Sequence, residues 1–110
     1  MEIIIHTKSR RQEPLLTAIN KKIKNGELKT WELKEHGKQE DVLYNHTPDQ
    51  WSGRVLLKPT DHEKGLEVFT TRWSTSPEPD EAAKGYIIGR FVEVLMVHFR
   101  TNFDLLEVRP

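Results

Sequence analysis

The chain has 110 residues, which suffices for one folded domain and is too short for two, so residues 1–110 are expected to form a single domain. It contains no cysteine, which excludes disulfide bonds, a thiol nucleophile and cysteine-based zinc sites. Lysine and arginine together number 17, as do aspartate and glutamate, and this balance argues against strong non-specific binding to a polyanion.

The first 25 residues predict a strand followed by a helix. Residues 2–7 contain three consecutive isoleucines, a pattern typical of a strand that is buried on both faces. Over residues 12–25, apolar side chains recur every three or four positions, which predicts a helix that Asn25-Gly26 ends. Because a helix follows the first strand, this strand is a candidate for parallel pairing.

The middle of the chain predicts short strands separated by turns. Residues 36–40 are expected to be the turn of a hairpin, residues 47–53 a loop, and Lys58-Pro59 the end of a strand. The expected strands cover residues 28–34, 42–44, 55–57 and 66–73.

A long helix is expected near the carboxyl terminus. The segment 74–81 is rich in serine, proline and acidic residues, which is typical of a helix start, and the helix should run from residue 81 to 100 or 102. Residues 105–108 are expected to add a last edge strand. The predicted fold is therefore α+β, a two-layer sandwich of a mostly antiparallel sheet of four to six strands with two helices, in the order β-α-β-β-β-β-α(-β).

The apolar sector of this last helix spans about 200°, twice the width that packing on one sheet needs. Either other parts of the chain or a second chain must cover the surplus. Gly85 and Gly89 in the helix interior each cost about 1 kcal/mol relative to alanine, which suggests that another backbone approaches closely there. The residues expected at a protein interface are Gly85, Gly89, Val92, Met96, Phe99, Phe103 and, from the loop, Trp51.

A basic stripe suggests a second type of partner. The first 30 residues carry seven basic and three acidic side chains, and several of the basic ones point away from the apolar face of the first helix. Such a stripe can contact phosphates, although a solvated outer helix face looks the same. The candidate phosphate contacts are Arg10, Arg11, Lys21, Lys22 and Lys24.

The sequence shows no catalytic constellation. The five histidines lack the spacing of a metal site, and Asp61-His62-Glu63 is interpreted as a polar turn. Neither a cofactor nor a metal is therefore expected. His98 projects from the apolar sector and is expected to be a structural core residue. A small enzyme built on His46, Asp49 and His98 stays an alternative, because such groups can be distant in sequence.

These patterns favour a small, soluble, cytoplasmic module that binds a protein partner or assembles with itself without catalysing a reaction. A homodimer through the last helix is one form of this hypothesis. A nucleic-acid-binding domain and a small histidine/carboxylate enzyme are the alternatives. The longest apolar stretch, residues 86–99, is interrupted and is shorter than the roughly 20 residues that span a bilayer, so no membrane segment is expected.

Overall fold

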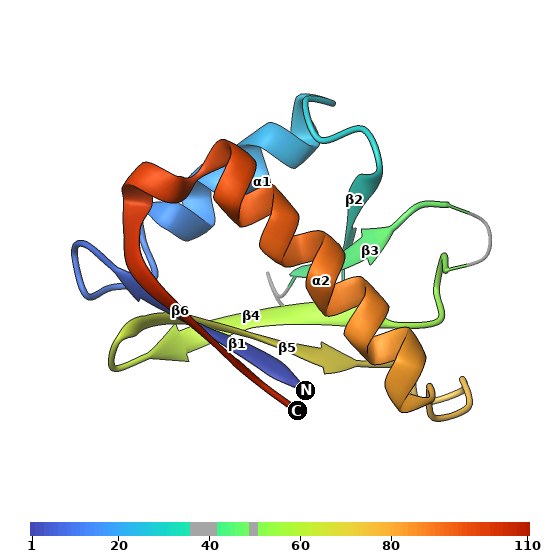
Figure 1. Ribbon diagram of the computed structural model, residues 1–110. Coiled ribbons are helices and arrows are strands. Elements are labelled where there is room, and N and C mark those ends of the chain that lie inside the picture. The colour runs from blue at the N-terminus through green and yellow to red at the C-terminus, as the bar shows by residue number, and fades with distance from the viewer. Residues whose placement is uncertain (36–41, 49–50) are drawn as a thin grey trace.

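The computed structural model describes residues 1–35, 42–48 and 51–110, which form one antiparallel sheet with both helices on the same face (Figure 1). The α+β class and the order of elements are confirmed, including the final strand. The elements are β1 (Glu2–Thr7), α1 (Leu15–Lys24), β2 (Trp31–Glu35), β3 (Val42–His46), β4 (Leu56–His62), β5 (Gly65–Thr71), α2 (Glu81–His98), the short 3₁₀ turn η1 (Arg100–Asn102) and β6 (Phe103–Arg109).

The strand order is β2-β3-β4-β5-β1-β6, and every neighbouring pair is antiparallel. Strand β1 lies between β5 and β6, so the parallel pairing left open by the sequence does not occur. Ile4 is opposite Glu67 on one side and Glu107 on the other, and a neighbour on each side explains why the isoleucines of β1 are buried. Glu2 is opposite Arg109, which places the two termini side by side (Figure 1).

Strand β4 is longer than expected. The sequence predicted an end at Lys58-Pro59, whereas the strand continues through Pro59 to His62. Proline lacks the N–H that a strand with two neighbours needs. Strand β3 pairs with β4 only at Leu56 and Leu57, while β5 pairs with β4 along its whole length. Pro59 therefore lies where β4 has one described neighbour, a position that tolerates proline.

The predicted hairpin is present with small shifts of its ends, and β4 and β5 form a second one. Strands β2 and β3 pair with Trp31 opposite His46, and the turn expected at 36–40 lies outside the described residues. Strands β4 and β5 meet at a tight turn that ends at Gly65, which has a φ of 138°. A Cβ on Gly65 would meet the Thr7 side chain and, at 2.9 Å, the Ile5 carbonyl oxygen, so the turn requires glycine.

Both helices differ from the prediction at one end. Helix α1 begins at Leu15 rather than near residue 12, with Pro14 at the position before it. Helix α2 begins as expected, because the Asp80 side chain accepts a 2.7 Å hydrogen bond from the Ala83 N–H. It ends at His98, since Phe99 leaves the helical conformation and turns its ring into the core.

No helix in the described part of the chain is long and apolar enough to cross a membrane.

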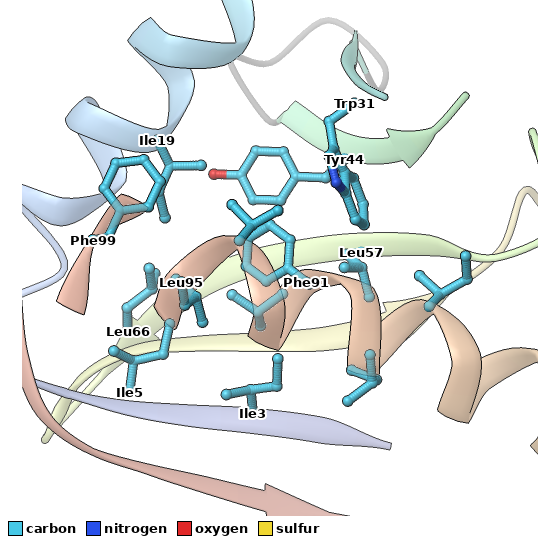
Figure 2. Packing of buried hydrophobic residues seen from close by; sticks show 14 of the residues in the cluster. Ile3, Ile5, Ile19, Trp31, Tyr44, Leu57, Leu66, Phe91, Leu95 and Phe99 are labelled. Carbon is cyan, nitrogen blue, oxygen red and sulfur yellow. The ribbon is translucent and has the colours of Figure 1, made fainter. Parts of the chain in front are cut away.

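Aromatic rings join α2 to the sheet. Phe91 is fully buried, and its ring stacks against Tyr44 of β3 at a centroid distance of 5.4 Å. Trp31 of β2 meets the same ring edge-on at 5.3 Å. Figure 2 shows Phe91 beneath Tyr44, whose hydroxyl points toward α1. There the Tyr44 hydroxyl donates a 2.7 Å hydrogen bond to Asn20. Burial raises the pKa of Tyr44, so this hydroxyl stays protonated.

We predict that Phe91→Ala destabilises the protein strongly, because it removes a ring that contacts both β2 and β3. The expected loss is about 3–5 kcal/mol in the free energy of unfolding, measured by urea denaturation. Val97→Ala on the same helix is the matched control, because this side chain is 66% exposed, and it should change the free energy by less than about 0.5 kcal/mol. Equal losses in the two variants would contradict the packing described.

Candidate functional site

Helix α2 presents a different surface on each side of its buried face. At 100° per residue, Gly85 and Met96 lie on one flank, and Tyr86 and Val97 lie on the other. The first flank is near β1, since a Cβ on Gly85 would be 3.9 Å from the Met1 methyl group. The second flank faces β2 and β3 across a pocket. The two flanks of α2 therefore face opposite edges of the sheet.

The residues proposed for a protein interface divide into two groups. Phe99 and Phe103 are buried in the core and are covered by the chain itself. The elements after α2 thus cover part of the wide apolar sector. The other five residues keep accessible surface, and they are Gly85, Gly89, Val92, Met96 and Trp51.

The first flank continues onto the last strand of the sheet. Leu106 and Val108 are opposite Ile5 and Ile3, so they lie on the sheet face that the helices cover. Leu106 packs against the core in part, whereas Val108 is 52% exposed. Met96, on α2, is 49% exposed. We call the surface formed by Val92, Met96, Leu106, Val108 and the open side of β6 the edge surface.

The second flank borders a pocket of about 440 Å³, a volume that suits a small ligand or an inserted side chain. Its apolar wall includes Leu28, Trp31 and Val97. Its polar groups include His46 of β3 and, from α2, Arg90. We call this cavity the His46 pocket.

His46 is the polar residue most enclosed within this pocket. It is 5% exposed, and its ring lies 4.7 Å from the Trp31 ring. Burial lowers the pKa of His46 and Arg90 lowers it further, while hydrogen bonding to the Thr30 backbone and the Glu93 charge act in the opposite direction. The net effect is a neutral imidazole at pH 7. Its Nδ1 is buried and has no hydrogen-bond partner among the described residues.

Aromatic rings and a paired arginine form the rim of the pocket. Tyr86 stacks on Trp51 with ring centroids 4.4 Å apart. The Arg90 guanidinium lies over the Tyr86 ring at 5.0 Å and donates a 2.9 Å hydrogen bond to the Tyr86 hydroxyl. Arg90 is also 3.7 Å from the Glu93 carboxylate. The two opposite charges at this rim therefore largely offset each other.

Asn45 holds the loop that carries Trp51. Its side chain is buried on the sheet face opposite His46, since successive residues of a strand point to opposite faces. Its amide donates to Glu32 at 2.8 Å and to Ser52 at 3.1 Å, and its carbonyl accepts from the Gly53 N–H at 2.8 Å. Adjacent residues of β3 thus anchor the loop and line the pocket.

The predicted phosphate contacts form two groups rather than one stripe. Arg10 and Arg11 precede α1, while Lys21, Lys22 and Lys24 lie in its last turns. A helix of ten residues is about 15 Å long, so it separates the two groups. The Lys22 ammonium lies 5.8 Å from the centre of the Phe99 ring.

Two residues of the alternative catalytic group, His46 and His98, both line the His46 pocket. His98 is exposed at the end of α2 and lines the His46 pocket, so its assignment to the core is wrong. Asp49 lies outside the described residues. The turn at His62 is held by a 3.0 Å hydrogen bond from the Lys64 N–H to the His62 Nδ1. Among the described residues, no cluster of three or more histidine and acidic side chains has metal-binding geometry.

No protein-family model, curated protein or solved structure matches this chain. The geometry of the edge surface and of the His46 pocket is therefore the basis for assigning a function.

We predict that His46 makes the protein less stable in acid. Its folded-state pKa lies below the ordinary value of about 6.5, so the unfolded chain binds the proton first as the pH falls. This contribution to stability is complete above pH 6.5 and is lost as the pH falls toward the folded-state pKa. The free energy of unfolding should therefore fall more steeply between pH 7.5 and 5.5 in the wild type than in His46→Phe.

His62→Gln is the control for this measurement, because His62 is the last residue of β4 and keeps partial exposure. Its pH dependence should follow that of the wild type. If His46→Phe also follows the wild type, the imidazole is not held neutral by burial.

Proposed function

We propose that this protein is a non-catalytic assembly module that pairs with a second copy of itself through the edge surface. The observation that carries the proposal is the open side of β6, the last strand of the sheet, which exposes Leu105 and Val108 on its two faces. An edge strand with free N–H and C=O groups is a template for pairing with another strand. Apolar side chains on both faces would be covered by such pairing.

The flank of α2 beside this strand supports the same proposal. Met96 and Val92 keep accessible surface there, next to the two glycines of the helix. A Cβ on Gly89 would meet nothing within 4 Å, so no contact within the described chain requires glycine at this position. Close approach by a second α2 would give these costly glycines a physical reason.

The sequence of β6 favours a copy of itself as the partner. The strand runs from residue 103 to 109, so a two-fold axis at Leu106 uses its full length in antiparallel pairing. This register places Asp104 opposite Val108 and Leu105 opposite Glu107. Shifting the axis to Glu107 would set that carboxylate against its own copy, which is unfavourable. The charges of β6 thus favour one register.

The same symmetry brings the two α2 helices together. The partner's helix lies on the same face of the combined sheet, because a two-fold axis perpendicular to the sheet preserves its faces. Leu106 of each chain then lies at the centre, beneath the two flanks that carry Met96. An apolar surface exposed in one chain becomes the centre of a two-chain core.

We predict that the wild-type protein is a dimer in light scattering after size exclusion at 10–200 μM. Val108→Glu should raise the dimer dissociation constant by about tenfold or more, because it places a carboxylate opposite Asp104 of the partner subunit. Val97→Glu is the matched control: it changes an exposed valine on the opposite flank of α2 and should leave the dimer intact.

A monomeric wild type over this concentration range would overturn the proposal. Dissociation by Val97→Glu together with a stable Val108→Glu dimer would also overturn it, because the contact would then involve the other flank. Circular dichroism of each variant confirms that it is folded before its mass is compared.

A further inference from the structure

We propose that His6 makes pairing through the edge surface depend on pH, so that the dimer becomes tighter as the pH falls from 8 to 6. This inference rests on the proposed function, because it concerns the charges that the two-fold axis brings together. It is argued from the contact between His6 and Glu107, from the place of Glu107 in the antiparallel register, and from the ordinary chemistry of imidazole.

Glu107 is the charged residue of β6 nearest to the proposed axis. Because Leu106 and Val108 lie on the face that the helices cover, Glu107 lies on the open face of the sheet. An axis at Leu106 places Glu107 directly opposite Leu105 of the partner subunit. The two Glu107 carboxylates are then diagonal neighbours, about 7–8 Å apart. They repel each other, so the free energy of pairing depends on how each carboxylate is compensated.

His6 of β1 is the group that can change this compensation. Its Nε2 lies 2.7 Å from the Glu107 carboxylate, and its side chain is 14% exposed. A neutral imidazole can donate an N–H to the carboxylate, whereas an imidazolium adds a full positive charge to the same hydrogen bond. Histidine is the side chain that ordinarily gains this charge between pH 8 and 5. His6 can therefore offset the charge of Glu107 in mild acid and leave it uncompensated by the imidazole in mild base.

Glu107 itself keeps its charge over this range of pH. The hydrogen bond with His6 lowers the pKa of Glu107 most, and the Arg109 charge lowers it further against a smaller effect of burial. Arg109 is 3.6 Å from the carboxylate and 58% exposed, and a guanidinium stays charged at every pH of interest. The compensation of Glu107 thus changes between pH 8 and 6 through His6 and not through Arg109.

The other groups that face His6 lie farther from the proposed axis. Directly opposite His6 on β5 is Gly65, and beyond it on β4 is His62. Both helices lie on the other face of the sheet and add no charge here (Figure 1). Lys8 pairs with Asp104 at 3.0 Å. The remaining charged groups around His6 are Glu2 on β1, Lys64 in the β4–β5 turn and Glu67 on β5. Strands β4 and β5 are at least two strands from the axis, so pairing leaves their surroundings unchanged.

The direction of the effect follows from thermodynamic linkage. Pairing brings a second carboxylate near each His6, which favours the protonated imidazole, so the two chains take up protons when they associate. By reciprocity, protons favour association, and the dissociation constant falls as the pH falls. The loss of fold stability predicted for His46 in acid would weaken the dimer, so it cannot produce this tightening.

The test measures the dimer dissociation constant of the wild type at pH 8, 7 and 6 by sedimentation equilibrium at low salt. The constant should fall about three- to tenfold from pH 8 to pH 6. Sodium chloride at about 0.5 M should remove most of this change, because it screens charges at the separation of the two carboxylates. His6→Gln keeps a neutral donor for Glu107 but does not titrate, so its constant should vary by less than about twofold. His62→Gln is the matched control and should retain the wild-type pH dependence.

A wild-type dimer whose dissociation constant is unchanged or higher at pH 6 would overturn this inference and leave the proposed dimer standing. A His6→Gln dimer with the wild-type pH dependence would overturn it as well. A wild type that is monomeric at both pH 8 and pH 6 would instead overturn the proposed function, and this inference with it. The wild-type series needs no variant, so the test holds even if His6→Gln does not fold.

Discussion

The contact between Phe91 and the rings of Tyr44 and Trp31 fixes the position of α2, and both candidate surfaces follow from that position. Phe91 is the point at which the helix meets β2 and β3, and its burial sets the rotation of the helix about its own axis. Once Phe91 points into the sheet, Met96 must lie on the flank toward β1 and β6, and Val97 on the flank toward β2. The edge surface and the His46 pocket are therefore two consequences of one packing arrangement.

Much of the fold could be predicted from periodicity, and the errors have local causes. Short apolar runs and, over residues 28–34, alternation of apolar and polar residues identified the strands, and the three- and four-residue spacing identified the helices. Pro59 led to a false strand end, because the sequence does not show that β4 has only β5 beside it there. The parallel pairing was left open for a related reason. Strand order depends on contacts between distant segments, and β1 finds both of its neighbours beyond residue 64.

The surfaces were harder to predict than the elements. The width of the apolar sector could not show that Phe99 and Phe103 would turn inward after the helix ends at His98. His98 was assigned to the core from its angle on the helix. That angle gives a direction, whereas burial depends on which elements extend far enough to cover the residue.

His46 was named only as part of an alternative catalytic group, and its burial was not foreseen because the strand was predicted to end at Tyr44. Extending the same alternation by two residues puts His46 on the face of Tyr44, and this signal could have found it. The pairing of β2 with β3 places Trp31 opposite His46 and so determines what surrounds the imidazole. No local sequence pattern reveals that pairing. In the proposed dimer, the β6 strands meet at the two-fold axis and the β2 strands lie at the outer ends of the combined sheet. The two His46 pockets would then face away from the contact between the chains, so self-association would leave both pockets open.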